Sequence, residues 1–376
     1  MTLPTYVPIL KAMKSEGIAL QNIQTNDFKQ IVPLFEIPKV TKQIEEAARF
    51  RGAVDLAQAY LDEVIRRINN VWNGNQAIID IFNWDPNFKI QSGEHILEYT
   101  LNKLYNLGVQ VIPTIGYDRW GYNEYKIALE NLELPEIPYF CLRLEDVAFD
   151  DSLDSVFFLE NIEGILDDLN LDPHNCSVLI DFGDSTKRSL SEMEKTVDRI
   201  ISLLKHLNFK FYITAGCSIP SSINLAVKNE NSAAKVQRKE MILWQNKILA
   251  YEGISLIYGD YGVRGPNSNE GSIAPDANGK IRYTIEKHSY IVRGHSMRKG
   301  VKGEQMWALA DFLVNSQYYK NPNYSWGDFQ IKQCSLKLIK GGHSEWISID
   351  TNHHLYFVLE EIHDFILMKN IKVQTI

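Results

Sequence analysis

The chain has 376 residues, a formal net charge of −8 at pH 7, and apolar and charged fractions of 45% and 23%, a composition typical of soluble globular proteins. The acidic balance argues against general nucleic-acid binding, because phosphate backbones are bound by concentrated Lys and Arg. No apolar run approaches the roughly 18 residues of a membrane span. Four cysteines without CxxC spacing lie mostly in or beside apolar runs, so we expect buried free thiols and a cytoplasmic location.

Eight short apolar, β-branched runs alternate with stretches of helical pattern. In chain order they are Tyr6–Leu10, Val32–Ile37, Ala77–Ile81, Val109–Ile115, Tyr139–Glu145, Cys176–Asp181, Lys210–Ala215 and Ile254–Asp260. Each pair is separated by enough chain for a crossover helix, which parallel strands require. The pattern predicts a closed (β/α)8 barrel, with an open doubly wound sheet as the alternative. No run is followed by GxGxxG or GxxxxGK[ST], the two common nucleotide-binding patterns.

The intervening stretches predict helices with recognisable ends. Thr41 is expected to cap a long helix to about Val71, Ser189 opens a capping box that starts a helix to His206, and Lys235–Tyr251 is expected to be helical before Gly253.

The pattern changes after residue 263. Residues 264–288, rich in Gly, Pro, Asn and Ser at their start, are expected to form a long loop. We therefore predict a barrel core over 1–263 and a C-terminal α+β elaboration over 289–376 packed on the barrel. Its expected elements are an extended Ser289–Arg293, a helix over Gly303–Ser316, extended Cys334–Leu338 and Glu345–Ile349, and a last helix over His353–Met368.

Charged residues stand at or near the carboxyl ends of the predicted strands. They are Lys11, Glu36, Asp80, Arg143, Glu145, Asp181 and Asp260. Side chains alternate along a strand, so Leu34 shares a face with Glu36, Cys141 with Arg143 and Glu145, Leu179 with Asp181, and Tyr258 with Asp260. If these faces point inward, the charged ends meet at one barrel mouth, which is where (β/α)8 enzymes carry their active sites.

Such a cluster can support catalysis in two ways. Like charges raise some pKa values while Lys and Arg lower others, which supplies an acid and a base at one pH. Alternatively, Glu36, Asp80, Glu145 and Asp181 are candidate ligands for Mg2+ or Mn2+, which prefer oxygen donors. Lys11 and Arg143 would then hold an anionic substrate. The structural alternative is that the charges pair with one another and fill the barrel end.

The tail offers further candidates. Arg293 belongs to a basic stretch beside glycines that could bind phosphate. Of the adjacent His353 and His354, we expect one at most to face a site, and we expect Asn352 to be a helix N-cap.

Two groups of residues resemble a known family. Tyr6–Lys11 with Lys14 and Glu16, followed by Pro33–Ile37, is similar to the opening of the "beta family" proteins of phages, prophage satellites and bacterial genomes. Tyr324-Ser325-Trp326-Gly327-Asp328 and Asn352-His353-His354 are similar to its C-terminal motifs. Ile347 departs from the Arg expected after Trp346. The resemblance implies an association with mobile elements and antiphage defence, and it places Lys11, Glu36, Ser325, Trp326, Asp328 and His353 in one site or framework.

Two functions remain open. The first is an enzyme of a phage-associated or defence system, whose barrel mouth hydrolyses a phosphorylated or nucleotide-like substrate. The second is a catalytically silent subunit that binds or senses another protein of a defence module. Its surface would include the aromatic tail (Tyr318, Tyr319, Tyr324 and Trp326) and the loop after the barrel. Arg293, Ser325, Trp326, Asp328 and His353 are the candidate substrate- or partner-binding residues.

Overall fold

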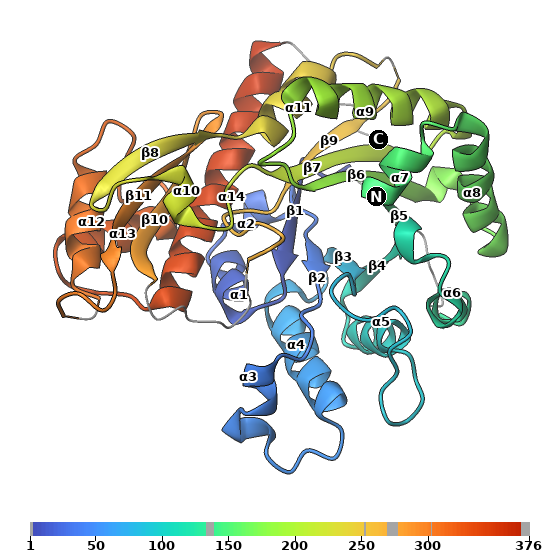
Figure 1. The fold of residues 1–376 in the computed structure, drawn as a ribbon, viewed down its shortest axis with the longest axis horizontal. Coiled ribbons are helices and arrows are strands. Elements are labelled where there is room, and N and C mark those ends of the chain that lie inside the picture. The colour runs from blue at the N-terminus through green and yellow to red at the C-terminus, as the bar shows by residue number, and fades with distance from the viewer. Residues whose placement is uncertain (1–2, 133–138, 252, 269–276, 302, 370–376) are drawn as a thin grey trace.

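The computed structural model describes residues 3–132, 139–251, 253–268, 277–301 and 303–369. Eight parallel strands close into a barrel in the order β1-β2-β3-β4-β5-β6-β7-β9 (Figure 1). They are β1 (Tyr6–Lys11), β2 (Leu34–Glu36), β3 (Gln76–Asp80), β4 (Gln110–Gly116), β5 (Phe140–Leu144), β6 (Cys176–Asp184), β7 (Phe211–Cys217) and β9 (Leu256–Asp260). The predicted barrel is confirmed and the open sheet is excluded, because β1 pairs with both β2 and β9.

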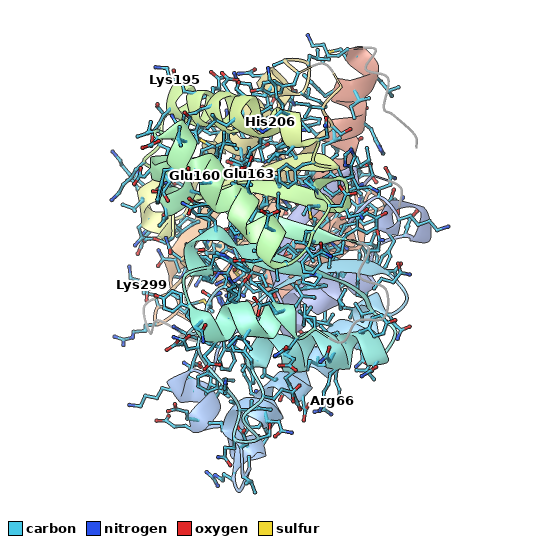
Figure 2. All side chains as sticks on the ribbon, turned by 90° about the vertical axis from the view of Figure 1, so that its right-hand side faces the viewer. Arg66, Glu160, Glu163, Lys195, His206 and Lys299 are labelled. Atoms are coloured by element: carbon cyan, nitrogen blue, oxygen red, sulfur yellow. The ribbon has the colours of Figure 1, made fainter. Side chains whose placement is uncertain are left out.

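Helices surround the barrel. They are α1 (Lys14–Gln21), α2 (Thr25–Phe28), α3 (Lys42–Glu45), α4 (Leu56–Trp72), α5 (Ile96–Asn106), α6 (Asn123–Glu130), α7 (Asp146–Asp151), α8 (Ser155–Asp168), α9 (Leu190–Leu204), α10 (Ile223–Ala226) and α11 (Lys239–Lys247). Ser189 caps α9 by accepting from the Glu192 amide, as the capping box predicts. Charged residues on the outer faces, such as Glu160 and Glu163 of α8 and Lys195 of α9, are exposed (Figure 2). The opposite faces bury apolar side chains against the sheet.

The C-terminal elaboration is a three-stranded antiparallel sheet with three helices. Its strands, in the order β10-β11-β8, are β10 (Asn278–Ile285), β11 (His288–Ser296) and β8 (Ser232–Gln237). The helices are α12 (Gln305–Val314), α13 (Trp326–Ser335) and α14 (His343–Met368). The long helix α14 lies between this sheet and the barrel (Figure 1), and it packs against α1, α13 and β10. The elaboration is therefore joined to the barrel through α14.

The structure differs from the sequence prediction in four segments. The helix expected over Lys235–Tyr251 is shorter, because its first residues belong to β8 and α11 begins only at Lys239. β8 is held in the antiparallel sheet by β11, with Ser232 opposite Arg293 and Gln237 opposite His288. Cys334–Leu338 and Glu345–Ile349 are not strands, since the first is the end of α13 followed by a turn and the second lies inside α14. α14 begins ten residues before the predicted start at His353. It is buried on nearly all sides, so the helical period is not visible in its sequence.

Two further boundaries change. The helix expected over residues 41–71 is broken into α3, a short 3-10 turn over Ala48–Phe50 and α4, with Gly52 at a positive φ of 81° between them. Residues 278–285, expected within the long loop, form β10. Residues 269–276 of that loop lie outside the described ranges. All four cysteines are buried and free, as predicted. No helix within the described ranges is long and apolar enough to cross a membrane.

The close contact between α13 and α14 depends on Gly327. A Cβ at this position would collide with the Ile349 carbonyl oxygen and lie 3.0 Å from the His353 amide nitrogen. Because both obstacles are helix backbone, we predict that Gly327→Ala lowers the free energy of unfolding by about 1–3 kcal/mol. Urea unfolding followed by tryptophan fluorescence measures this change.

Gly164 is the matched control, because it also lies in a helix but its Cβ would meet nothing within 4 Å. Gly164→Ala should leave stability unchanged or raise it by up to about 1 kcal/mol. Equal stabilities for the two variants would contradict the proposed close contact.

Candidate functional site at the barrel mouth

Inward-facing side chains bring the predicted charges together at one end of the barrel. Apolar residues of the interior include Leu34, Cys141 and Leu179, so Glu36, Arg143 and Asp181 two residues further on also point inward. The same alternation places Asp80 after Ile78 of β3. Each of these charged residues is at most 1% exposed. The convergence predicted from the strand ends is therefore present for Glu36, Asp80, Arg143 and Asp181.

Arg143 is the centre of this group. Its Nε and Nη2 donate to Asp181 Oδ2 at 3.0 and 2.7 Å, and its Nη1 donates to Asp80 Oδ2 at 2.7 Å. Nη2 also donates to Glu36 Oε1 at 2.9 Å and to the Tyr261 hydroxyl at 2.8 Å. We call Glu36, Asp80, Arg143, Asp181 and Tyr261 the Arg143 cluster. It joins β2, β3, β5 and β6 to the residue that follows β9.

Two members of this neighbourhood were not foreseen from sequence. Tyr261 donates its hydroxyl proton to Asp181 Oδ2 at 2.6 Å. Arg119, in the turn after β4, forms two hydrogen bonds to the Asp80 carboxylate. A Cβ on Gly116 would collide with the Arg119 guanidinium, so this glycine makes room for the ion pair. The sequence feature that could have indicated this ion pair is a glycine at the end of a predicted strand, Gly116, followed three residues later by Arg119.

The four carboxyl groups near Arg143 have unlike electrostatic environments. Burial raises the pKa of Asp80, but Arg119 and Arg143 outweigh it and hold that pKa below its usual value. Burial raises the pKa of Glu36 despite Arg143 and Lys11. Burial also raises the pKa of Glu145 to about 8, because Arg143, at 3.8 Å, is opposed by Asp181 and Asp118. At neutral pH the site thus holds an ionised Asp80 and a protonated Glu145.

Two carboxyl oxygens are available for further chemistry. Glu36 Oε2 and Glu145 Oε2 are buried and have no hydrogen-bond partner among the described residues. The Glu145 side chain is 17% exposed, whereas those of Asp80 and Glu36 are 1% exposed. Glu145 is therefore the carboxyl group of this set that is best placed to meet a ligand from solvent.

Lys11 is beside the cluster but is directed to a different partner. It is paired with Glu36 in the β1–β2 register. Its ammonium donates to the carbonyl oxygens of Pro266 and Ser268 at 3.2 and 3.5 Å. Lys11 therefore ties the segment after β9 to the barrel mouth.

A family model described as Beta protein matches residues 6–360, from β1 to near the end of α14. The chain belongs to the Beta protein family. The resemblance seen at both ends of the sequence is thereby confirmed over nearly the whole chain. Comparison with curated proteins gives no match.

Asp260 of this Beta protein family member does not join the Arg143 cluster. In β9 the inward residues are Ile257 and Tyr261, so Asp260 points outward, contrary to our prediction. It accepts from the Tyr6 and Tyr258 hydroxyls at 2.5 and 2.8 Å and lies 2.9 Å from His354 Nε2. Both faces of β9 are apolar, so alternation alone could not choose the inner one.

The family's tail residues form an internal framework. Ser325 caps α13 and donates to Asp328 Oδ2 at 2.6 Å. Asp328 also accepts from Tyr283 at 2.6 Å and lies 2.8 Å from His353 Nδ1. His353 Nε2 faces the Thr284 carbonyl oxygen at 2.9 Å. Both ring nitrogens of His353 therefore have an oxygen partner, one on the Asp328 carboxylate and one on the backbone.

The remaining tail candidates also have internal partners. Trp326 is partly buried against the C-terminal core. The Arg293 guanidinium donates to the Val227 and Lys228 carbonyl oxygens, each at 2.7 Å. Asn352 is not an N-cap, because it lies inside α14, where it donates to the Ala19 carbonyl oxygen and accepts from the Gly327 amide. These contacts hold the elaboration together, and a binding role for Arg293, Ser325, Trp326, Asp328 or His353 stays a prediction.

The candidate metal ligands do not form a metal site in the described part of the chain. No group of three or more His, Cys, Asp or Glu side chains there is arranged to hold an ion. Asp80 and Asp181 direct their oxygens to arginine or tyrosine donors instead. The donor set therefore does not fit Mg2+ or Mn2+.

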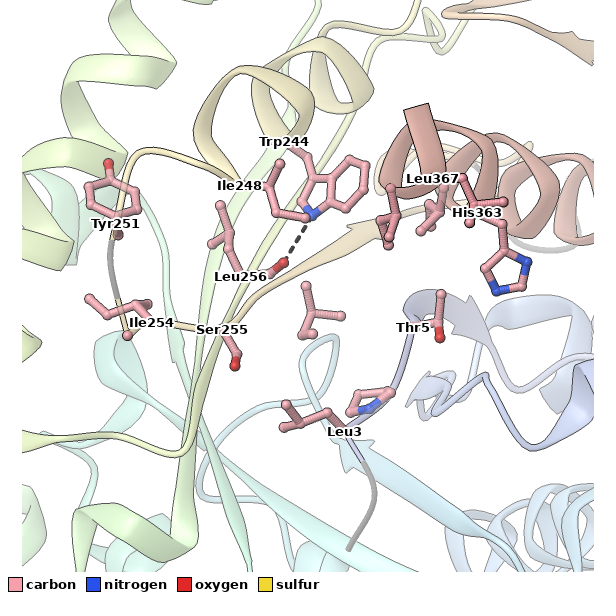
Figure 3. A pocket seen from close by; sticks show the side chains of 15 residues that line it. Leu3, Thr5, Trp244, Ile248, Tyr251, Ile254, Ser255, Leu256, His363 and Leu367 are labelled. Carbon is pink, nitrogen blue, oxygen red and sulfur yellow. Dashed lines mark hydrogen bonds between the residues drawn. The ribbon is translucent and has the colours of Figure 1, made fainter. Parts of the chain in front are cut away.

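An apolar cavity of about 560 Å3 lies at the opposite end of the barrel. Its lining residues precede β1, precede or begin β9, or come from α11 and the last turns of α14, as Leu3, Ile254, Trp244 and Leu367 show (Figure 3). The Trp244 indole donates to the Leu256 carbonyl oxygen at 3.0 Å on its wall. In (β/α)8 enzymes the chemistry is at the other face, so this cavity is not our candidate active site.

The Arg143 cluster makes a stability prediction. Arg143→Met should lower the free energy of unfolding by about 3–5 kcal/mol, because it leaves buried carboxylates without their cation. The deficit should shrink as the pH approaches 4, where carboxyl groups become protonated. Urea unfolding at several pH values measures both effects.

Arg49→Met is the control, since Arg49 pairs with Glu63 but its side chain is 52% exposed. It should cost less than about 1 kcal/mol. A loss for Arg143→Met that is equally small, or independent of pH, would contradict the proposed electrostatic role.

Proposed function

We propose that this member of the Beta protein family is an enzyme of a phage- or mobile-element-associated system that hydrolyses a phosphorylated or nucleotide-like substrate at its barrel mouth. The observation that supports this most strongly is the division of the carboxyl groups around Arg143. One of them, Glu145, is protonated near neutral pH, has a free oxygen and is partly exposed, while Asp80 is held ionised. Such a division is typical of acid–base sites.

Hydrolysis requires one proton to be given and one to be taken. Protonated Glu145 donates to the oxygen that leaves as its bond breaks. Glu36, whose Oε2 has no partner in the described ranges, accepts a proton from the attacking water. Arg143, Asp80 and Asp181 act as positioning residues, because their hydrogen bonds are directed to one another. Charge stabilisation of the substrate then has to come from cations other than Arg143.

The family context is the basis for the cellular part of the proposal. The residues at both ends of the chain resemble proteins of phages and prophage satellites, and this resemblance implies antiphage defence. The partner genes that accompany such systems would supply or respond to the product.

The proposal predicts a characteristic pH profile. Because Glu145 acts while protonated, kcat/KM for a phosphorylated substrate should fall about tenfold per pH unit above pH 8. Because Glu36 acts as a carboxylate, kcat/KM should also fall in the acidic range. Glu145→Gln should reduce kcat about 100-fold or more, since general acid catalysis contributes at least that much. The measurement is phosphate or nucleoside release from a panel of phosphate esters and nucleotides.

Glu163→Gln, an exposed carboxyl on α8, is the charge-matched control and should keep wild-type activity. Asp181→Asn should slow the reaction through its effect on Arg143. Activity that survives Glu145→Gln with an unchanged pH profile would rule out its role as the acid.

One observation favours a second function. Every nitrogen of the Arg143 guanidinium already donates to a neighbour, so the cluster can also be understood as a structural closure of the barrel end. The chain would then be a catalytically silent subunit that binds a protein partner. Trp326 is a poor probe of this function because it packs against the core. Phe329, which is 45% exposed on α13, is a better one.

The two functions give opposite results with the same variants. If the chain is a silent subunit, a stoichiometric partner should co-purify with wild type and with Glu145→Gln but be lost from Phe329→Ala. If it is the proposed enzyme, turnover should be lost in Glu145→Gln and kept in Phe329→Ala.

A further inference from the structure

A cavity of about 1100 Å3 lies beside the barrel mouth, between the barrel and the C-terminal elaboration. Its walls come from residues within 219–223 after β7, 263–268 after β9, 277–282 at the start of β10 and 340–347 at the start of α14. We call it the rim pocket. β7 and β9 are the seventh and eighth strands of the barrel. In (β/α)8 enzymes, the loops after these two strands frequently bind phosphate together with a helix N-terminus.

The charge lining the rim pocket is strongly positive. Arg264, Lys280, Arg282 and Lys340 line it, and the single lining carboxylate among the described residues is Glu345. That carboxylate accepts a hydrogen bond from the Gly342 amide. The pocket is therefore complementary to an anion.

Three of the four lining cations have one carboxylate partner each, and Lys280 differs from them. Arg264 lies 3.2 Å from Glu16, Arg282 lies 3.4 Å from Asp350, and Lys340 lies 3.5 Å from Glu304. No hydrogen bond or ion pair joins the Lys280 ammonium to another residue in the described ranges. The positive charge of Arg282, together with burial and with Arg264, lowers the pKa of Lys280 to about 7. This mutual repulsion is what a bound anion would relieve.

Asp350 compensates the cations only in part. It is 1% exposed, and burial raises its pKa to about 7 despite the neighbouring Arg282. Its Oδ1 has no partner among the described residues. Near neutral pH a fraction of Asp350 is uncharged, so the excess of positive charge at the pocket is larger than a count of side chains suggests.

The first turn of α14 adds backbone donors to the same wall. This 26-residue helix begins after Gly342, which has no side chain to cap the free amides. Helix N-termini carry partial positive charge and exposed N–H groups, and they are common phosphate-binding elements. Apolar residues such as Ile219, Met306 and Trp346 line other parts of the pocket. Its size and mixed lining suit an organic molecule that carries a phosphoryl group.

The rim pocket is close to the proposed acid. Tyr261 donates to Asp181 and accepts from Arg143, whose Nη2 is 3.8 Å from Glu145. Val263 and Arg264, directly after Tyr261 and Gly262, line the rim pocket. A ligand held in the pocket can therefore extend toward the barrel mouth along this segment.

We propose that the rim pocket binds the phosphoryl group of a small phosphorylated molecule, with Arg264, Lys280 and Arg282 as its anion-binding residues. The binding site itself is independent of catalysis. It deepens the proposed function by supplying the cations that Arg143 does not provide, and it rests on that function only for the claim that the bound molecule is hydrolysed.

The test compares three probes on the full chain by calorimetry: AMP, adenosine and inorganic pyrophosphate. Wild type should bind AMP and pyrophosphate, bind adenosine at least tenfold more weakly, and lose affinity as salt rises. Lys280→Gln and Arg282→Gln should each weaken AMP binding at least tenfold. Lys287→Gln, which removes the same charge at the far end of the β10–β11 hairpin, should change it less than twofold. Thermal unfolding checks that each variant is folded.

The outcomes separate this inference from the proposed hydrolase. Equal affinities for AMP and adenosine, equal AMP binding by Lys280→Gln and wild type, or no binding of any probe would overturn the phosphoryl site. Phosphate-dependent binding that needs Lys280, is unaffected by Glu145→Gln, and is accompanied by no turnover of any substrate in the panel, would support the site and contradict the hydrolase.

Discussion

A guanidinium group with no access to water is the constraint on which the barrel mouth depends. Arg143 is 0% exposed, and burying an unpaired cation would cost more free energy than the total free energy of unfolding of a typical domain. It is neutralised by carboxylates from β2, β3 and β6 and by the Tyr261 hydroxyl. Because hydrogen bonds are directional, Glu36, Asp80 and Asp181 must lie at the same level along the barrel axis to reach Arg143. The cluster thereby specifies strand register as well as charge.

The second organising element is α14, whose buried polar residues reach in different directions. Asn352 contacts α1 and α13, His353 pairs with Asp328 of α13, and His354 faces Asp260 of β9. Consecutive positions on a helix project about 100° apart, so three neighbours can join three elements. This arrangement fixes the elaboration against the barrel, and the start of α14 forms one wall of the rim pocket. The adjacent histidines of the sequence thus have structural partners rather than a shared ligand.

Sequence patterns predicted the barrel well because parallel strands buried on both faces give short, dense apolar runs. They also predicted that Glu36, Asp80, Arg143 and Asp181 would converge, since the carboxyl ends of parallel strands meet at one rim. The same reasoning failed for Asp260, because alternation in β9 fits either face. Arg119 and Tyr261 were missed because they follow strands rather than end them. The rim pocket could not be predicted from the sequence, since its cations come from separate segments that only folding brings together. Arg264 follows β9, Lys280 and Arg282 lie in β10, and Lys340 precedes α14.

The place of β8 in the chain has a consequence for folding during synthesis. β8 lies between β7 and α11, yet it pairs with β11, which follows the last barrel strand. A barrel that closes as soon as β9 leaves the ribosome would display an unsatisfied strand edge until β10 and β11 arrive. The order of translation therefore leaves this segment open to wrong pairing for a time. Because β8 lies between two barrel strands in the sequence, no single cut in the chain separates the barrel from the elaboration.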